Sequence, residues 1–222
     1  MGLCESKKRF VRGSKKTVKP LSNNLETYLS ATPVIDWNVK AVADKAAEVA
    51  DHLDDDVEKA KRLFEWVRDN IPHSKDIDSD VVTCSASEVL AEGTGICFAK
   101  SHLLAAMLRS VGIPAGFCYQ VCAQDEPEQG MVLHGFNGIY LASLNRWIRV
   151  DPRGNTGGID AQFDLREERL AFPPDPARGE FVFDEIWPNP VAEIVDVLSK
   201  FSSRREMWEY LPASLAVKTA AT

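Results

Sequence analysis

Three residues whose side chains can act together in nucleophilic catalysis occur in order along this chain: Cys97, His134 and Asp151. Cys97 follows the glycine-rich stretch 93–96 and precedes a run whose apolar residues recur every three or four positions, which predicts an amphipathic helix. A thiol in the first turn of a helix feels about half a positive elementary charge, and this favours the nucleophilic thiolate. His134 lies in a strand-like run over 131–141, and Asp151 ends a second run over 146–151.

The two strand-like runs predict a hairpin centred between Ser143 and Leu144. In that register Asp151 lies opposite Phe136, and His134 is the diagonal neighbour of Asp151 on the same face of the sheet. A shift of one residue would place the two side chains on opposite faces. The pairing therefore predicts a triad in which Cys97 attacks a carbonyl carbon, His134 transfers the proton and Asp151 orients the imidazole.

An oxyanion site needs hydrogen-bond donors beside the nucleophile. The backbone N–H of Cys97, at the start of the predicted helix, is one such donor. Papain-like proteases supply a second donor from a glutamine six residues before the cysteine, but this chain has Ala91 there, and no second donor can be identified. Taken singly, each triad residue also has a structural interpretation: a small buried thiol, a histidine satisfied within a sheet and a turn-forming aspartate.

The elements that must position these residues follow from periodicity and capping. Asp36 is predicted to open a first helix, and the residues 57–71 form a second that ends at Pro72. The capping box Ser85-Ala86-Ser87-Glu88 predicts a short third helix. His73 is interpreted as a loop histidine. Further predictions are a strand over 115–121, an irregular surface path over 159–190 and a helix over 191–199, so the fold class is α+β.

Charge divides the chain unevenly. Residues 1–20 hold seven basic residues and one acidic residue, whereas the remainder holds 19 basic and 32 acidic residues. We therefore predict a flexible basic arm over 1–20, a catalytic domain over 21–200 and a partly helical or frayed tail over 201–222. The acidic body argues against nucleic-acid binding.

The five cysteines, without C-x-x-C pairs, predict neither a disulfide framework nor a metal site, and Cys84 is interpreted as structural. We expect no cofactor. No apolar run is long enough for a membrane span, and the N-terminus lacks a signal peptide, which favours a cytoplasmic protein of undetermined oligomeric state. Met1-Gly2-Leu3-Cys4-Glu5-Ser6 matches an N-acylation pattern, and the match leaves acylation or coincidence open.

Four motifs together resemble the transglutaminase-like superfamily. They are Gly95-Ile96-Cys97, Arg109-Ser110-Val111-Gly112-Ile113-Pro114, His134 and Trp147-Ile148-Arg149-Val150-Asp151-Pro152, within residues 57–155. The resemblance implies a papain-like transglutaminase core, in which N-terminal helices precede a nucleophile helix packed on an antiparallel sheet, and it carries the family's catalytic roles onto Cys97, His134 and Asp151. Outside this span the chain resembles the single-domain bacterial branch. His134-Gly135-Phe136-Asn137-Gly138 departs from the aromatic and acidic residues that often follow the family histidine.

The resemblance implies a cysteine-nucleophile enzyme that acts on an amide or peptide bond through an acyl-cysteine intermediate, as a cysteine protease or amidase. Its partner would be a peptide or protein substrate that carries an amide. One alternative is a protein-glutamine transglutaminase, which transfers the acyl group to an amine instead of water. A second alternative is a non-catalytic binding module on the same fold. The chain has no acidic run with the spacing of a calcium loop, so calcium dependence is not carried over.

Overall fold

The computed structural model describes residues 18–124 and 130–215. The helices are α1 (Lys40–Val49), α2 (Asp56–Asn70), α3 (Ala86–Glu92), α4 (Cys97–Ser110), α5 (Ala192–Lys200) and α6 (Arg204–Trp208). The strands are β1 (Lys19–Pro20), β2 (Ala115–Ala123), β3 (Met131–Leu141), β4 (Arg146–Val150), β5 (Phe181–Val182) and β6 (Glu185–Ile186). The predicted α+β class, with the nucleophile helix on an antiparallel sheet, is confirmed.

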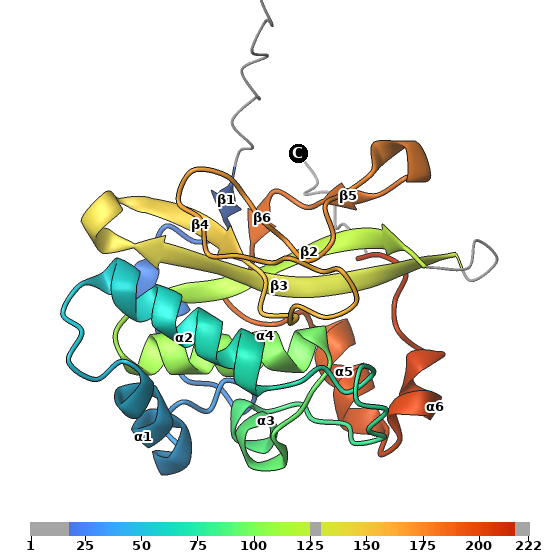
Figure 1. Cartoon of the computed structure of the whole chain (residues 1–222), viewed down its shortest axis with the longest axis horizontal. Coiled ribbons are helices and arrows are strands. Elements are labelled where there is room, and N and C mark those ends of the chain that lie inside the picture. The colour runs from blue at the N-terminus through green and yellow to red at the C-terminus, as the bar shows by residue number, and fades with distance from the viewer. Residues whose placement is uncertain (1–17, 125–129, 216–222) are drawn as a thin grey trace, which may run out of the picture.

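The sheet has the antiparallel order β4-β3-β2-β5, and β1 pairs with β6 in a separate parallel ribbon. Figure 1 shows the helices gathered on one side of this sheet, while part of the segment that follows β4, in orange, crosses the other side. Helix α4 lies in the middle of the helical layer, and every residue from Cys97 to Arg109 is buried. The helix that carries the cysteine is therefore the central element of the core.

The register of β3 against β4 agrees with the predicted hairpin. Asn137 pairs with Val150 and Leu141 with Arg146, so Asp151 follows directly after the end of the ladder. His134 and Asp151 are consequently on the same face of the sheet, as the alternation of side chains along a strand requires.

The two faces of the sheet bury separate apolar clusters. Phe117 and Tyr119 face α4 and belong to the main core, whereas Cys118 and Phe136 face the other way. There they pack with Tyr28, Leu170 and Ile186. The prediction that 159–190 runs irregularly over the surface is wrong in part. This segment forms β5 and β6 and supplies buried residues, because the outer face of β2 and β3 is apolar and must be covered.

The first helix begins later than predicted. It starts at Lys40 rather than Asp36, whose carboxylate instead accepts hydrogen bonds from the backbone N–H and the hydroxyl of Ser87 at the start of α3. Short acidic residues favour helix N-termini, and here the terminus that Asp36 caps belongs to a helix about fifty residues along the chain. The predicted bounds of the helix before Pro72 and of the helix after Val191 agree with α2 and α5 to within one residue.

Parts of the predicted division into arm, domain and tail fall on residues that are not described. Residues 1–17, including the Met1-Gly2-Leu3-Cys4 pattern, and residues 216–222 lie outside the described residues. The last two residues of the predicted arm form β1, and the predicted tail contains α6. No helix of the described residues is long and apolar enough to cross a membrane.

Candidate active site

The turn before α4 delivers Cys97 to the start of the helix. Gly93 ends α3 in the left-handed region, at φ +65°, as a non-glycine residue would do only with strain. Gly95 is closely surrounded, since a Cβ there would lie 2.9 Å from the hydroxyl of Thr83. Helix α4 begins at Cys97 without a side-chain cap. Its first backbone N–H groups therefore have no partner within the helix and can bind an anion.

Gly135 allows the start of α4 to approach β3. A Cβ at this position would lie 2.4 Å from the ring of Phe98, so only glycine fits under the first turn of the helix. The Ser101 hydroxyl bonds both the Cys97 carbonyl, at 2.8 Å, and the Gly135 carbonyl, at 3.2 Å. The backbone N–H of Gly135 also lowers the pKa of the Cys97 thiol. Helix and strand are thus joined directly beside the thiol.

His134 links the thiol to a buried carboxylate. Its Nε2 atom lies 2.8 Å from Oδ2 of Asp151, and the charge and hydrogen bonding of the same imidazole lower the pKa of the Cys97 thiol. The ring stacks on Phe136 at 6.0 Å and meets Phe172 edge-on at 5.0 Å, which restricts its rotation. The structure therefore brings together the three residues that the sequence analysis singled out.

Asp151 is fully buried, and both of its carboxylate oxygens accept hydrogen bonds. Oδ1 accepts from the backbone N–H of Arg153 at 3.1 Å, and Oδ2 accepts from that of Ala171 at 3.0 Å as well as from His134. Burial alone would raise the pKa of Asp151, but His134 and the two N–H donors hold it below its usual value. The carboxylate therefore stays ionised beside the imidazole.

The same contacts shift the other two groups toward an ion pair. Burial would raise the pKa of Cys97, but the charge of His134 and hydrogen bonds from His134 and Gly135 lower it below the usual value of a thiol. Burial would lower the pKa of His134, but Asp151 and Cys97 raise it. These opposite shifts favour thiolate and imidazolium together, as in an activated cysteine.

A cavity of about 630 Å³ opens onto this group, and Cys97 and His134 both line it. Its walls come from the loop before α3, the ends of β2 and β3, the segment after β4 and the C-terminal segment with Trp208 and Leu211. Such a volume is typical of sites for small ligands or extended side chains. Among the described residues, no cluster of three histidine, cysteine or acidic side chains could hold a metal ion.

His73, interpreted as a loop histidine, lies between α2 and α3 and also lines the cavity, which the sequence did not predict. It is only 3% exposed, and it forms a bridge with Gly95, two residues before Cys97. Burial, and then the charge of Arg153, lower the pKa of His73 well below its usual value, so the ring is neutral. Nδ1 accepts from the backbone N–H of Lys75 at 3.2 Å, which places the ring proton on Nε2. A histidine after an isoleucine-proline helix end carries no local signal of such burial.

The remaining described cysteines lack the partners of Cys97. Burial raises the pKa of Cys84, Cys118 and Cys122, and no imidazole is among the groups that shift the pKa of these thiols. The backbone carbonyl of Cys84 bonds Nδ1 of His102 at 2.7 Å, which agrees with its structural interpretation. Cys97 is therefore the cysteine whose surroundings favour nucleophilic chemistry.

A family model described as the transglutaminase-like superfamily matches residues 43–152. Through this segment the chain belongs to that superfamily. The match begins within α1 and ends directly after Asp151, so it contains Cys97, His134 and Asp151 and the elements that position them. No curated protein matches the chain.

Three solved structures are similar to parts of this chain. A structure named a putative cysteine protease from Cytophaga hutchinsonii is 19% identical, with a TM-score of 0.50, over 60% of this chain and 43% of that chain. A structure named a putative protease from Parabacteroides distasonis is 13% identical, with a TM-score of 0.38, over 75% of this chain and 30% of that one. One named a TGase is 15% identical, with a TM-score of 0.39, over 60% of this chain and 35% of that one. The chain thus spans less than half of the length of each of these three proteins.

Proposed function

We propose that this protein is a thiol enzyme that cleaves an amide bond of a peptide or protein through an acyl-cysteine intermediate. The observation that carries the proposal is the 2.8 Å contact of His134 with the buried Asp151, where the same imidazole lowers the pKa of the Cys97 thiol, at the wall of a cavity. A buried carboxylate that serves only the sheet would not require an imidazole between itself and a thiol at a helix N-terminus.

In the first half of the reaction the Cys97 sulfur attacks the carbonyl carbon of the amide. The C–N bond breaks as His134 gives its proton to the leaving nitrogen, and the acyl group remains on the sulfur. In the second half His134 takes a proton from water, whose oxygen attacks the thioester, and the Cys97 sulfur leaves as the free acid forms. Asp151 stabilises the imidazolium and fixes the ring throughout.

The tetrahedral intermediate needs two donors toward its oxygen. We assign these to the backbone N–H of Cys97 and to Nε2–H of His73, the second donor that the sequence could not identify. His73 suits this role because its ring is neutral, is oriented by the Lys75 N–H and lines the cavity beside the helix start. A neutral donor of this kind costs no change of protonation during the reaction.

Acyl transfer to an amine is the second candidate, since the same residues would catalyse it. The acceptor is decided by whether an amine or water reaches the thioester first. The proposal commits to water. A supporting feature is that charged residues, among them Lys75 and Asp76, line the cavity and favour the presence of water over an apolar acceptor.

The test is an assay with glutamine-containing peptides, in which both the side-chain amide and the backbone peptide bonds can be cleaved. The assay is run with and without a primary amine. We expect release of ammonia or a new peptide N-terminus without the amine, and no such product from Cys97→Ser. Formation of product only when the amine is present would establish the transferase instead. Absence of turnover and of selective Cys97 alkylation by iodoacetamide would establish the binding module.

A matched pair of variants tests the oxyanion assignment. His73→Phe removes the Nε2 donor with a ring of similar size, and we expect kcat to fall about 100-fold with little change in KM. His102→Phe is the control, because His102 is likewise buried but does not line the cavity. Equal losses from the two variants would exclude a role for His73 in the reaction.

A further inference from the structure

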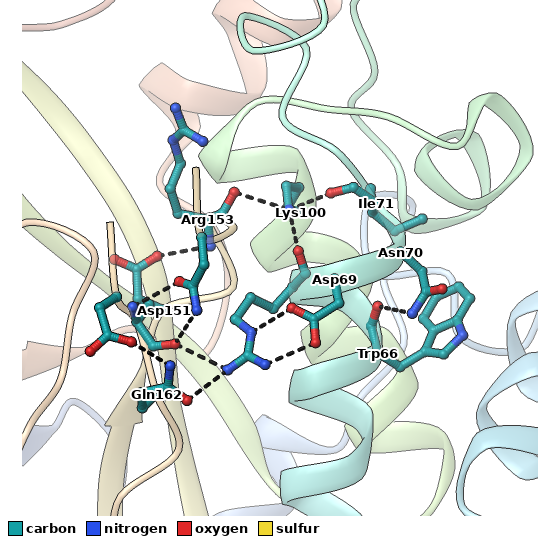
Figure 2. A network of polar contacts seen from close by, with 12 residues as sticks. Trp66, Asp69, Asn70, Ile71, Lys100, Asp151, Arg153 and Gln162 are labelled. Atoms are coloured by element: carbon teal, nitrogen blue, oxygen red, sulfur yellow. Dashed lines mark hydrogen bonds and ion pairs between the residues drawn. The ribbon is translucent and has the colours of Figure 1, made fainter. Parts of the chain in front are cut away.

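Lys100 is a fully buried lysine one turn after Cys97 in α4. Its side chain has no solvent exposure, and its ammonium group donates to the backbone carbonyls of Ile71, Arg153 (3.0 Å) and Arg68 (3.4 Å). Figure 2 shows this group between Ile71 at the end of α2 and Arg153 in the turn after β4. All three of its N–H bonds are thus directed to backbone carbonyls from two separate segments.

Each of these two segments carries a residue of the site. Ile71 lies two residues before His73, and Arg153, whose backbone N–H bonds Oδ1 of Asp151, lies two residues after that aspartate. Lys100 itself belongs to the helix that begins at Cys97. A single nitrogen atom therefore joins the three segments that carry Cys97, His73 and Asp151.

The surroundings are built around this ammonium group. Gly154 has φ +107°, and a Cβ there would lie 3.4 Å from both the Lys100 nitrogen and the Arg68 carbonyl. Burying a charge away from water carries a large free-energy cost, and neutral groups could cap the end of α2 without that cost. If the residue at this position had a purely structural role, an uncharged side chain could fill it at a smaller free-energy cost of burial.

We propose that Lys100 is a positioning residue of the candidate site: its ammonium group fixes the Asp151–Arg153 turn against α2 and α4, and thereby keeps the Asp151 carboxylate in contact with His134. This inference rests on the proposed function, in which His134 must be held as the proton carrier. It adds a residue that touches neither substrate nor reacting atoms and acts through Asp151.

The test follows the alkylation of Cys97 by iodoacetate as a function of pH. Iodoacetate is an anion, so the thiolate reacts faster while His134 is positively charged, and the rate falls at high pH as the imidazolium loses its proton. The groups facing His134 are Cys97 from α4, Asp151 after β4 and His73 from the loop before α3. The charged groups acting on Lys100 are Arg153, Asp151, Asp76 and Asp69.

In Lys100→Met, we expect the falling limb of the profile to move to lower pH, because Asp151 raises the pKa of His134 and the loosened turn weakens that contact. A displacement of about one pH unit corresponds to a roughly tenfold slower reaction on that limb. Burial lowers the pKa of Lys100 to about 7, so little of its charge remains on the falling limb and the displacement reports the loosened turn. In an Asp151→Asn background, Lys100→Met should cause no further displacement.

Lys100→Gln keeps two N–H donors without the charge and serves if the methionine variant does not fold. Arg109→Met is the control, since Arg109 is also a buried cation of α4 that bonds only backbone carbonyls, those of Ser30, Ala115 and Pro188, at the far end of the helix. It should lower stability and leave the limb in place.

A limb that stays in place or moves to higher pH in the folded Lys100 variants would overturn the proposal. The proposal would also be overturned if the displacement of the limb in the double variant equalled the sum of the displacements in Lys100→Met and in Asp151→Asn. A wild-type profile without a falling limb would instead refute the role of His134 in the proposed function, and the two failures are therefore distinguishable.

Discussion

The contact between Gly135 and Phe98 provides the sharpest test of how the fold positions the thiol. In Gly135→Ala the new Cβ would lie 2.4 Å from Cδ1 and 2.8 Å from Cε1 of Phe98, far inside the normal separation of carbon atoms. The ring of Phe98 is 1% exposed and cannot swing into solvent. Helix α4 must therefore move away from β3 by about 1 Å.

Two consequences follow from that displacement. Overpacking of a close-packed core costs about 2 kcal/mol, which for a domain of this size lowers the melting temperature by about 4–8 °C. The Cys97 sulfur would also move from the Gly135 N–H and from His134, and a misplacement of about 1 Å can reduce turnover about 100-fold. Calorimetry and the peptide assay measure the two effects separately.

Gly138→Ala is the matched control. It lies on the same strand but faces the other side of the sheet, where a Cβ would lie 2.7 Å from the Ile186 side chain. We expect a comparable loss of stability with normal alkylation of Cys97. Wild-type turnover in Gly135→Ala would refute the role of this contact in positioning Cys97. A loss of turnover in Gly138→Ala as large as that in Gly135→Ala would refute it too.

Three further predictions concern the charged groups. Cys97→Ser should abolish turnover and leave the circular dichroism spectrum unchanged, because oxygen at this position is a far weaker nucleophile; an active variant would place the nucleophile elsewhere. Asp151→Asn should reduce kcat by about 10³–10⁴-fold, because the amide cannot hold the imidazole in the required orientation and charge state, as steady-state kinetics will show. Burial would raise the pKa of Asp76, but hydrogen bonds from Arg153 and Thr156 lower it to about 2. Since this is below the unfolded value, the stabilisation is present above about pH 4 and is lost as the pH falls to about 2. Urea unfolding should therefore show a smaller loss of stability over that range in Asp76→Asn than in wild type.

Local patterns in the sequence determined the helix that starts at Cys97 and the face on which His134 and Asp151 meet. The apolar spacing after Cys97 has the period of a helix, and alternation along the strands fixes the register, because a slip of one residue would expose an apolar face. Asp151 followed by Pro152 marks the end of the strand, since proline cannot continue a ladder. These signals all lie within a few residues of the feature they predict.

The tertiary structure alone decided what surrounds the triad. The Ala171 N–H that completes Asp151 is 20 residues away in an irregular segment, and the burial of His73 follows from its bridge to Gly95. Lys100 is a charged residue, yet it is buried because carbonyls from two other segments converge on it. No periodicity encodes such contacts, because each depends on where chain segments with unrelated local sequences come to rest against one another. Local spacing thus determined which side chains could react, and long-range packing decided which groups hold them in place.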